Sequence, residues 1–337
     1  MPSPNPNETT AERTAPVSAT TILHGGVLAG LRQARWLLSI VIPVSFAVFL
    51  LQELGILVLV SGALTPLFER TGLSGVGALG FVAGVITNPY TVVAIIGTAG
   101  LPVREIAILS VMCLIAHNFP VELSILRRTG SSVTRMFALR LGCALIAGLA
   151  LNLLMPGRGG LEADGSPPAG AESVLGAAAS PAEFGAALWE WAVSTAQLAG
   201  TILVILTALM VFVHLLRAYG IIERIAGALA PLMRIFGLPE ATSFLWLVCN
   251  LLGLSYGAAV LLEEEQAGRL RPADGDLLNH HVAVSHSMLE DTMIFVAVGA
   301  PLLWISIPRL VLALAAVWLR RGELRLRGNQ RYYSWPL

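Results

Sequence analysis

The sequence predicts an all-α integral membrane protein with two inverted repeats, each holding about three transmembrane helices, an interfacial helix and a broken or re-entrant helix. Three observations support this fold class: the composition, a series of long apolar runs, and an internal repeat. Of the 337 residues, 55% are hydrophobic and only 12% are charged. A soluble protein has about a quarter of its residues charged, so most of this surface is expected to face lipid. The formal net charge of zero argues against nucleic acid as a partner.

Six apolar runs are candidates for membrane-spanning helices, which need about 20 residues each. They are Trp36–Leu51, Ile106–Leu126, Met136–Met155, Trp191–Leu216, Leu277–Val298 and Leu302–Leu319. Two more apolar stretches, Gly75–Thr98 and Ala241–Leu262, are interrupted by Asn88-Pro89 and by Gly253. Each of these two is long enough for one span, or for two half-length helices folded back as a re-entrant hairpin.

Charged residues predict the orientation of these spans. Acidic residues prevail in the connector between the halves, whereas arginines cluster at three other places: Arg32 and Arg35, then Arg127, Arg128, Arg135 and Arg140, and finally residues 320–331. The positive-inside rule places arginine clusters in the cytoplasm. If the two interrupted stretches are re-entrant, the result is six spans in the cell (inner) membrane, with both termini cytoplasmic.

An internal repeat divides the chain into domains. Gly55–Leu73 aligns without gaps on Gly220–Leu238, and both copies read as an amphipathic helix in the membrane interface. The alternative is a chance match of two Gly/Pro-rich segments. We expect a disordered cytoplasmic lead-in (1–30), a first repeat (31–155), an external acidic, Gly-rich connector (156–187), a second repeat (188–320) and a cytoplasmic tail (321–337). An odd number of spans in each repeat makes the repeats inverted.

A second match places ionisable residues inside two predicted spans. After a short insertion in the second half, Ala116–Glu122 aligns with Ser285–Asp291, so that each half carries a His, a small polar residue and a carboxylate. Ionisable groups at membrane depth are costly unless they pair or line a wet cavity. We therefore predict one central site that binds a substrate or a coupling ion, formed by His117, Asn118, Glu122, His286, Ser287, Glu290, Asp291, Asn88 and Asn250.

The chemistry of this site has three readings. His286 and Glu290 would lie one helical turn apart, which makes them a candidate pair of ligands for a divalent metal ion. The same groups suit proton coupling, because His titrates near neutrality. The structural alternative is that these side chains only join spans by hydrogen bonds. The chain has no HExxH, GxSxG or P-loop pattern, so no enzyme activity is expected.

The His-Ser-Met-Leu-Glu-Asp run at 286–291, the Gly-Ala-Leu-x-Pro-Leu helix and the doubled half resemble the Gate (nucleoside-recognition) domain family. That domain occurs in concentrative nucleoside transporters, in the membrane part of ferrous-iron transporters and in spore-maturation membrane proteins. The resemblance covers roughly Trp36–Leu319 and implies transport around a central site. The chain lacks the Gly-Cys-Asn-Val-Pro signature of the ferrous transporters and the Glu-Ala-Pro-type sequence of the nucleoside carriers.

Two functions follow as expectations. The first is a secondary transporter that moves a small polar solute or cation, nucleoside-like or a divalent metal, through a site at the membrane midplane. The second is a non-transporting membrane scaffold or assembly partner. Beyond the lipid bilayer and the solute, a homo-oligomer is a candidate assembly, and no cofactor is expected other than a divalent metal ion or coupled protons.

Overall fold

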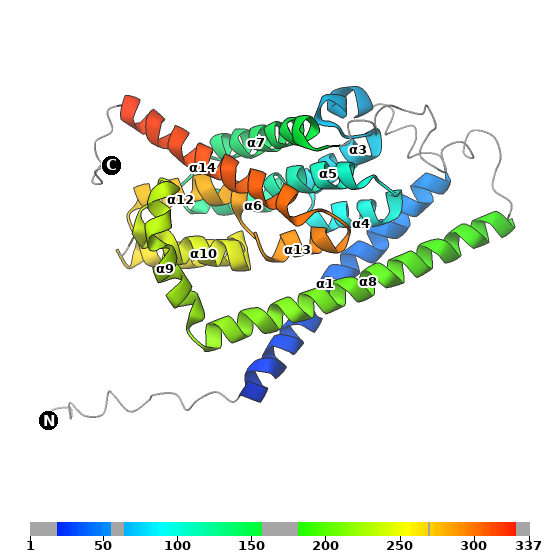
Figure 1. Ribbon diagram of the computed structural model, residues 1–337, viewed down its shortest axis with the longest axis horizontal. Helices are drawn as coiled ribbons and strands as arrows, with labels where there is room; N and C mark the ends of the chain where they lie inside the picture. The colour runs from blue at the N-terminus through cyan, green and yellow to red at the C-terminus, as the bar shows by residue number, and fades with distance from the viewer. Residues whose placement is uncertain (1–18, 55–63, 157–180, 269, 328–337) are drawn as a thin grey trace.

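The computed structural model of the protein describes residues 19–54, 64–156, 181–268 and 270–327 (Figure 1). Most of the predicted lead-in, connector and tail lies outside the described residues, as do residues 55–63 of the first repeat copy. Within the described ranges every regular element is a helix. The prediction of an all-α protein is therefore confirmed.

The helices of the two halves follow one another in matching order. The first half contains α1 (Ala19–Glu53), η1 (Glu69–Thr71), α3 (Gly75–Ile86), α4 (Pro89–Ala99), α5 (Val103–Ile115), α6 (Phe119–Arg128) and α7 (Val133–Leu154). The second contains α8 (Pro181–Ala218), α9 (Ile221–Ile235), η3 (Glu240–Thr242), α10 (Ser243–Leu252), α11 (Leu254–Gln266), α12 (Pro272–Ser285), α13 (Glu290–Ala297) and α14 (Leu302–Leu326). Each half thus begins with a long helix, continues through a 3-10 turn and two pairs of short helices, and ends with a long helix; the second half also contains α9 before its 3-10 turn.

Four helical stretches of the described residues are long and apolar enough to cross a membrane: Val103–Arg128, Val133–Leu154, Glu183–Ala218 and Leu302–Leu326. The expected span Trp36–Leu51 lies within α1, which has 35 residues and at 1.5 Å per residue extends about 52 Å. The expected span Ile106–Leu126 lies within the candidate span Val103–Arg128, but neither it nor the expected span Leu277–Val298 is one continuous helix. Both stretches are interrupted, at 116–118 and at 286–289, because polar residues there leave the helical conformation.

The two interrupted apolar stretches each form a helical hairpin. A Cβ atom added to Gly84 of α3 would lie 2.6 Å from Val92 Cγ2 of α4, and one added to Gly257 of α11 would lie 3.1 Å from Cys249 Cβ of α10. The four arms have 10 to 13 residues, or about 15–20 Å each. Such arms are too short to cross a hydrocarbon core of about 30 Å, so the hairpin alternative fits these stretches better than a single span.

The long helices α1 and α8 cross at close range beside the remaining helices (Figure 1). Glycines make this approach possible. A Cβ on Gly26 would lie 2.7 Å from Val211 Cα, and a Cβ on Gly30 would lie 2.4 Å from Thr207 Cα. Small residues four positions apart are the usual way for membrane helices to bring their backbones together. The α1 segment around Gln33 reaches the second half, where Gln33 Nε2 donates to Glu290 Oε1 at 2.9 Å.

Helix α9 corresponds to the second copy of the repeated segment. Its buried side chains are Ile222, Ala226 and Met233, whereas Glu223 and Arg234 are exposed. The helix is therefore amphipathic, as the sequence predicts, and its apolar face packs against α10.

Candidate functional site

The first interruption lies between α5 and α6. Asn118 has a positive φ of 48°, a conformation that Asn tolerates better than most residues. Pro120 follows in the first turn of α6, where its missing N–H is harmless but where it prevents a continuous helix. The backbone N–H of Asn118 donates instead to the carbonyl of Gly84 in α3, at 3.0 Å. The break is thus held by the end of the first hairpin.

The second interruption, between α12 and α13, repeats this geometry. Ser287 has a φ of 55°, and its N–H donates to the carbonyl of Cys249 in α10, at 3.0 Å. Leu289 N–H donates to the carbonyl of Asn250, at 3.2 Å. His286 and Glu290 are consequently not one turn apart on a helix, because His286 follows the end of α12 and Glu290 begins α13. The predicted geometry of this metal-binding pair was wrong.

Two fully buried arginines donate hydrogen bonds at the two interruptions. Arg140 of α7 donates through Nε to the carbonyl of Ile115, at 2.8 Å, and through Nη2 to that of His117, at 3.1 Å. Arg309 of α14 donates to the carbonyl of His286 and, at 2.8 Å, to Thr292 Oγ1. Both side chains have 0% exposure. Each guanidinium satisfies carbonyls that the interrupted helix leaves without an N–H partner.

Arg140 corrects an expectation from the sequence, which grouped it with the cytoplasmic arginines. It forms an ion pair with Glu122 inside the protein, and the Glu122 side chain is only 9% exposed. Arg309 was not predicted at all. Both arginines stand within apolar runs, and the same sequence offset that relates His117 to His286 relates Arg140 to Arg309. That coincidence is the signal by which the sequence could have revealed them.

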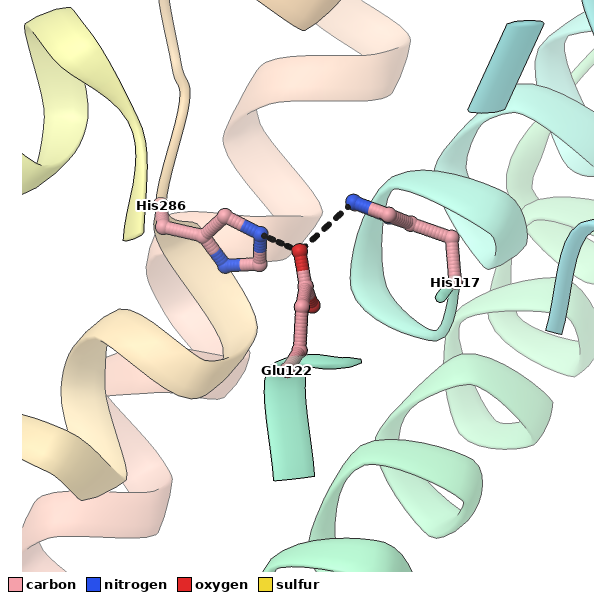
Figure 2. A group of neighbouring side chains, drawn as sticks. All are labelled: His117, Glu122 and His286. Carbon is pink, nitrogen blue, oxygen red and sulfur yellow. Dashed lines mark hydrogen bonds and ion pairs between the residues drawn. The ribbon is translucent and has the colours of Figure 1, made fainter. Parts of the chain in front are cut away.

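The rings of His117 and His286 face each other across Glu122 (Figure 2). Their ring centroids are 5.3 Å apart. Nε2 of His117 lies 3.0 Å from Glu122 Oε1, and Nε2 of His286 lies 3.1 Å from the same oxygen. One carboxylate oxygen from the first half is therefore shared by a histidine from each half. We call His117, Glu122 and His286 the His–Glu–His cluster.

The opposite nitrogen of each ring is fixed by the backbone. Nδ1 of His117 lies 2.8 Å from the carbonyl of Cys113, and Nδ1 of His286 lies 2.8 Å from the carbonyl of Val282. A carbonyl oxygen only accepts, so both Nδ1 atoms carry a proton. In a neutral ring Nε2 then presents a lone pair to Glu122. Cys113 contributes to this arrangement through its backbone carbonyl.

A cavity of about 340 Å³ adjoins the cluster. The interruptions of both broken helices, the tips of both hairpins and α1 all contribute to its wall. At the first hairpin tip, Asn88 Oδ1 accepts from the N–H of Thr91, at 3.1 Å, and so caps α4. Also in the cavity wall, Gln33 of α1 donates to Glu290 Oε1, at 2.9 Å. The cavity is thus the place where the four non-helical turns of the two halves meet.

Every predicted site residue except Asn250 lines this cavity. Asn250 is buried in α10 and donates to the carbonyl of Trp246, one turn earlier, at 2.8 Å. The amide nitrogen of Asn250 therefore bonds within its own helix, whereas its buried Oδ1 has no hydrogen-bond partner among the described residues. Gln33 is a lining residue that sequence reasoning missed, because a single polar residue at the start of an apolar run gives no functional pattern.

Comparisons with known proteins support the membrane assignment. The chain is 29% identical over 309 residues to a protein of Bacillus subtilis (strain 168) named "Uncharacterized membrane protein YvoD", covering 88% of this chain and 95% of that protein. No protein-family model and no solved structure matches the chain, so the resemblance to the Gate domain family stays a prediction. The protein is a helical membrane protein, similar over most of its length to that bacterial membrane protein.

Proposed function

We propose that this membrane protein is a secondary transporter, which moves a small polar solute or a cation through the cavity between its two halves. The observation that carries the proposal is the meeting of four interrupted helical segments around one cavity with buried ionisable groups. Interrupted helices expose backbone N–H and C=O groups that bind solutes and ions in transporters. Non-helical backbone at membrane depth is tolerated where it lines such a cavity.

The matched halves support alternating access. In the proposed arrangement the halves are inverted repeats, and the cavity opens to each side in turn as one half moves against the other. Glu122 comes from the first half and His286 from the second, so their contact spans the boundary that this motion would rearrange. The Gate resemblance adds nucleosides and divalent metal ions as candidate solutes. No catalytic reaction is assigned to the chain.

The proposed orientation has both termini in the cytoplasm of the cell that carries the protein in its inner membrane. Arg135 at the start of α7 pairs with Glu323 near the end of α14, so these two helix ends lie together. Cysteines introduced at Arg128 and Arg325 should react with a membrane-impermeant reagent from the cytoplasmic side, and one at Leu154 from outside. The native cysteines are buried, which keeps background labelling low. Labelling of positions 128 and 154 from one side would contradict the orientation.

The test of transport is uptake into proteoliposomes that contain the purified protein. A panel of labelled nucleosides and of Mn²⁺, Fe²⁺ and Zn²⁺ is offered, with and without a pH gradient. We expect uptake of at least one solute above that of empty vesicles. Glu290→Gln, in the cavity wall, should reduce uptake, whereas Glu223→Gln, on the exposed face of α9, should not.

The second candidate function is a non-transporting scaffold, and one observation favours it. Glu122 is bonded directly to Arg140, His117 and His286, which is the arrangement expected of side chains that only join helices. The uptake panel separates the two functions. If no solute is taken up, and cavity variants change only the stability of the protein, the transporter proposal fails and the scaffold remains.

A further inference from the structure

We propose that His117, Glu122 and His286 form a binding site for a divalent transition-metal ion. The two Nε2 atoms and a carboxylate oxygen all lie within 4.8 Å of one another, and all three residues are buried. They converge from α6 and from the interruptions that follow α5 and α12. This set replaces the His286–Glu290 pair that the sequence offered, because the broken helix turns Glu290 toward Gln33.

The first argument is the direction of the lone pairs. Both Nδ1–H groups donate to backbone carbonyls, so each neutral ring directs the lone pair of Nε2 toward Glu122 Oε1 (Figure 2). With both rings neutral, each Nε2 and Oε1 are acceptors 3.0–3.1 Å apart, which repel one another unless a proton or a metal cation lies between them. A divalent metal ion satisfies all three atoms at once, since His, in its neutral form, and carboxylate are its ordinary ligands.

The second argument is the support behind the ligands. Metal-binding histidines almost always donate their other ring N–H to a carbonyl or carboxylate, which fixes the tautomer and the ring orientation. Both histidines do so here, at 2.8 Å. Arg140 pairs with the remaining oxygen of Glu122, which holds that carboxylate ionised and leaves Oε1 for the ion. This support comes from backbone carbonyls and from a third helix, so the ligand set is fixed before an ion arrives.

The third argument is spacing. Metal–ligand bonds to His nitrogen and carboxylate oxygen are about 2.0–2.2 Å, which places neighbouring ligand atoms about 3.0–3.5 Å apart. The Nε2–Oε1 distances of 3.0 and 3.1 Å lie at the short end of that range. Two imidazoles with one carboxylate favour ions such as Zn²⁺, Fe²⁺ or Co²⁺ over Mg²⁺ and Ca²⁺, which prefer all-oxygen sites.

The surroundings hold further ionisable side chains and provide access. Arg140 and Arg309 lie beside the site, and the acidic residues Glu290 and Asp291 line the adjoining cavity. The open side of the cluster faces the cavity, where water or the side chains of Asn118 and Ser287 can complete the coordination. That the ion is also the transported cation rests on the proposed function, whereas its binding does not.

Binding is tested on the full-length protein, purified in detergent and stripped with chelator. Titration with Co²⁺ should produce visible ligand-field absorption at one ion per chain, and X-ray absorption should show imidazole nitrogen around the ion. His286→Gln and His117→Gln each remove a direct ligand, and each should weaken Co²⁺ and Zn²⁺ binding by at least the roughly 10- to 100-fold that loss of a supporting partner costs. The matched control is His214→Gln, because His214 makes the same Nδ1 contact to a carbonyl one turn earlier in α8 yet is not in the cluster.

The outcomes are distinct. Wild type that binds no Co²⁺, binding without imidazole nitrogen, or equal loss in His214→Gln would each overturn the metal site. The wild-type spectrum alone decides the matter even if a cluster variant fails to fold. Metal binding at the cluster with no uptake of any solute would uphold the site and sink the proposed transport. Nucleoside uptake by a protein that binds no metal would do the reverse.

Discussion

The interruption between α5 and α6 and that between α12 and α13 have the same backbone geometry. They differ in the side chains that contact the buried arginine. Each has a residue with positive φ, an N–H bonded to a hairpin carbonyl, and a buried arginine on the carbonyl of the histidine. In the first, the arginine also pairs with a carboxylate, Glu122. In the second, the arginine hydrogen-bonds to Thr292, a neutral partner, and is attracted electrostatically by Asp291, which lines the cavity together with Glu290.

This difference shows that the two halves repeat the backbone geometry of the interruption but not the placement of its carboxylates. The carboxylate of Glu122 already contacts side chains inside the protein, and one of them, His286, belongs to the other half. Glu290 instead lies at the cavity wall beside Gln33. We infer that the first break supplies a fixed anion to the cluster, and that the second supplies carboxylates that can meet a solute.

The largest effect should come from the arginines. Arg140→Leu leaves Glu122 as a buried charge without its guanidinium partner, and should lower the free energy of unfolding by about 3–5 kcal/mol. Arg309→Leu leaves neutral hydrogen-bond acceptors unsatisfied and loses the electrostatic attraction between Arg309 and Asp291, and should cost about 1–3 kcal/mol. Reversible unfolding in mixed micelles measures both values, with exposed Arg234→Leu as control. An equal or larger loss in Arg309→Leu would mean that the two breaks do not differ as described.

A sharper comparison uses the two glutamates. Glu122→Gln removes the anion that Arg140 and both histidines face, and should cost about 3 kcal/mol. Glu290→Gln keeps a hydrogen bond to Gln33 and borders the cavity, so its cost should stay below about 1 kcal/mol. The same unfolding assay decides between them. If Glu290→Gln proves the more damaging, the second break carries an ionic role that its contacts do not show.

The smallest effect concerns the residues with positive φ. Asn tolerates the left-handed region, whereas Ser pays a larger part of its steric cost of about 1–2 kcal/mol. Ser287→Gly should therefore gain up to about 1 kcal/mol more stability than Asn118→Gly, even though it removes the long 3.3 Å contact between Ser287 Oγ and Asp291 N–H. Melting temperatures of the two glycine variants provide the comparison. A greater gain in Asn118→Gly would show that Ser287 is not the more strained residue.

The sequence predicted much of the site because its residues are costly to place in a membrane. The paired His-polar-carboxylate motifs were recognisable inside apolar runs, and all but Asn250 of the predicted site residues line one cavity. Asn250 could not be excluded, since a polar side chain that bonds to its own helix looks the same in sequence as one that faces a solute. Arg140 was misplaced because an arginine near a helix start looks cytoplasmic unless its buried partner is known.

What the sequence determined by itself is the membrane character, the helical class and the two sets of polar residues. The lengths of the apolar runs and the number of charged residues predict the first two features directly, because only helices and closed barrels can span a lipid bilayer. Tertiary structure alone decided that the two histidine-bearing stretches are broken and that Glu122, not Glu290, joins His117 and His286. The physical reason is that a break is stabilised by distant partners. The carbonyls of Gly84 and Cys249 accept its free N–H groups, and Arg140 and Arg309 donate to its free carbonyls. No local pattern in the sequence records those contacts.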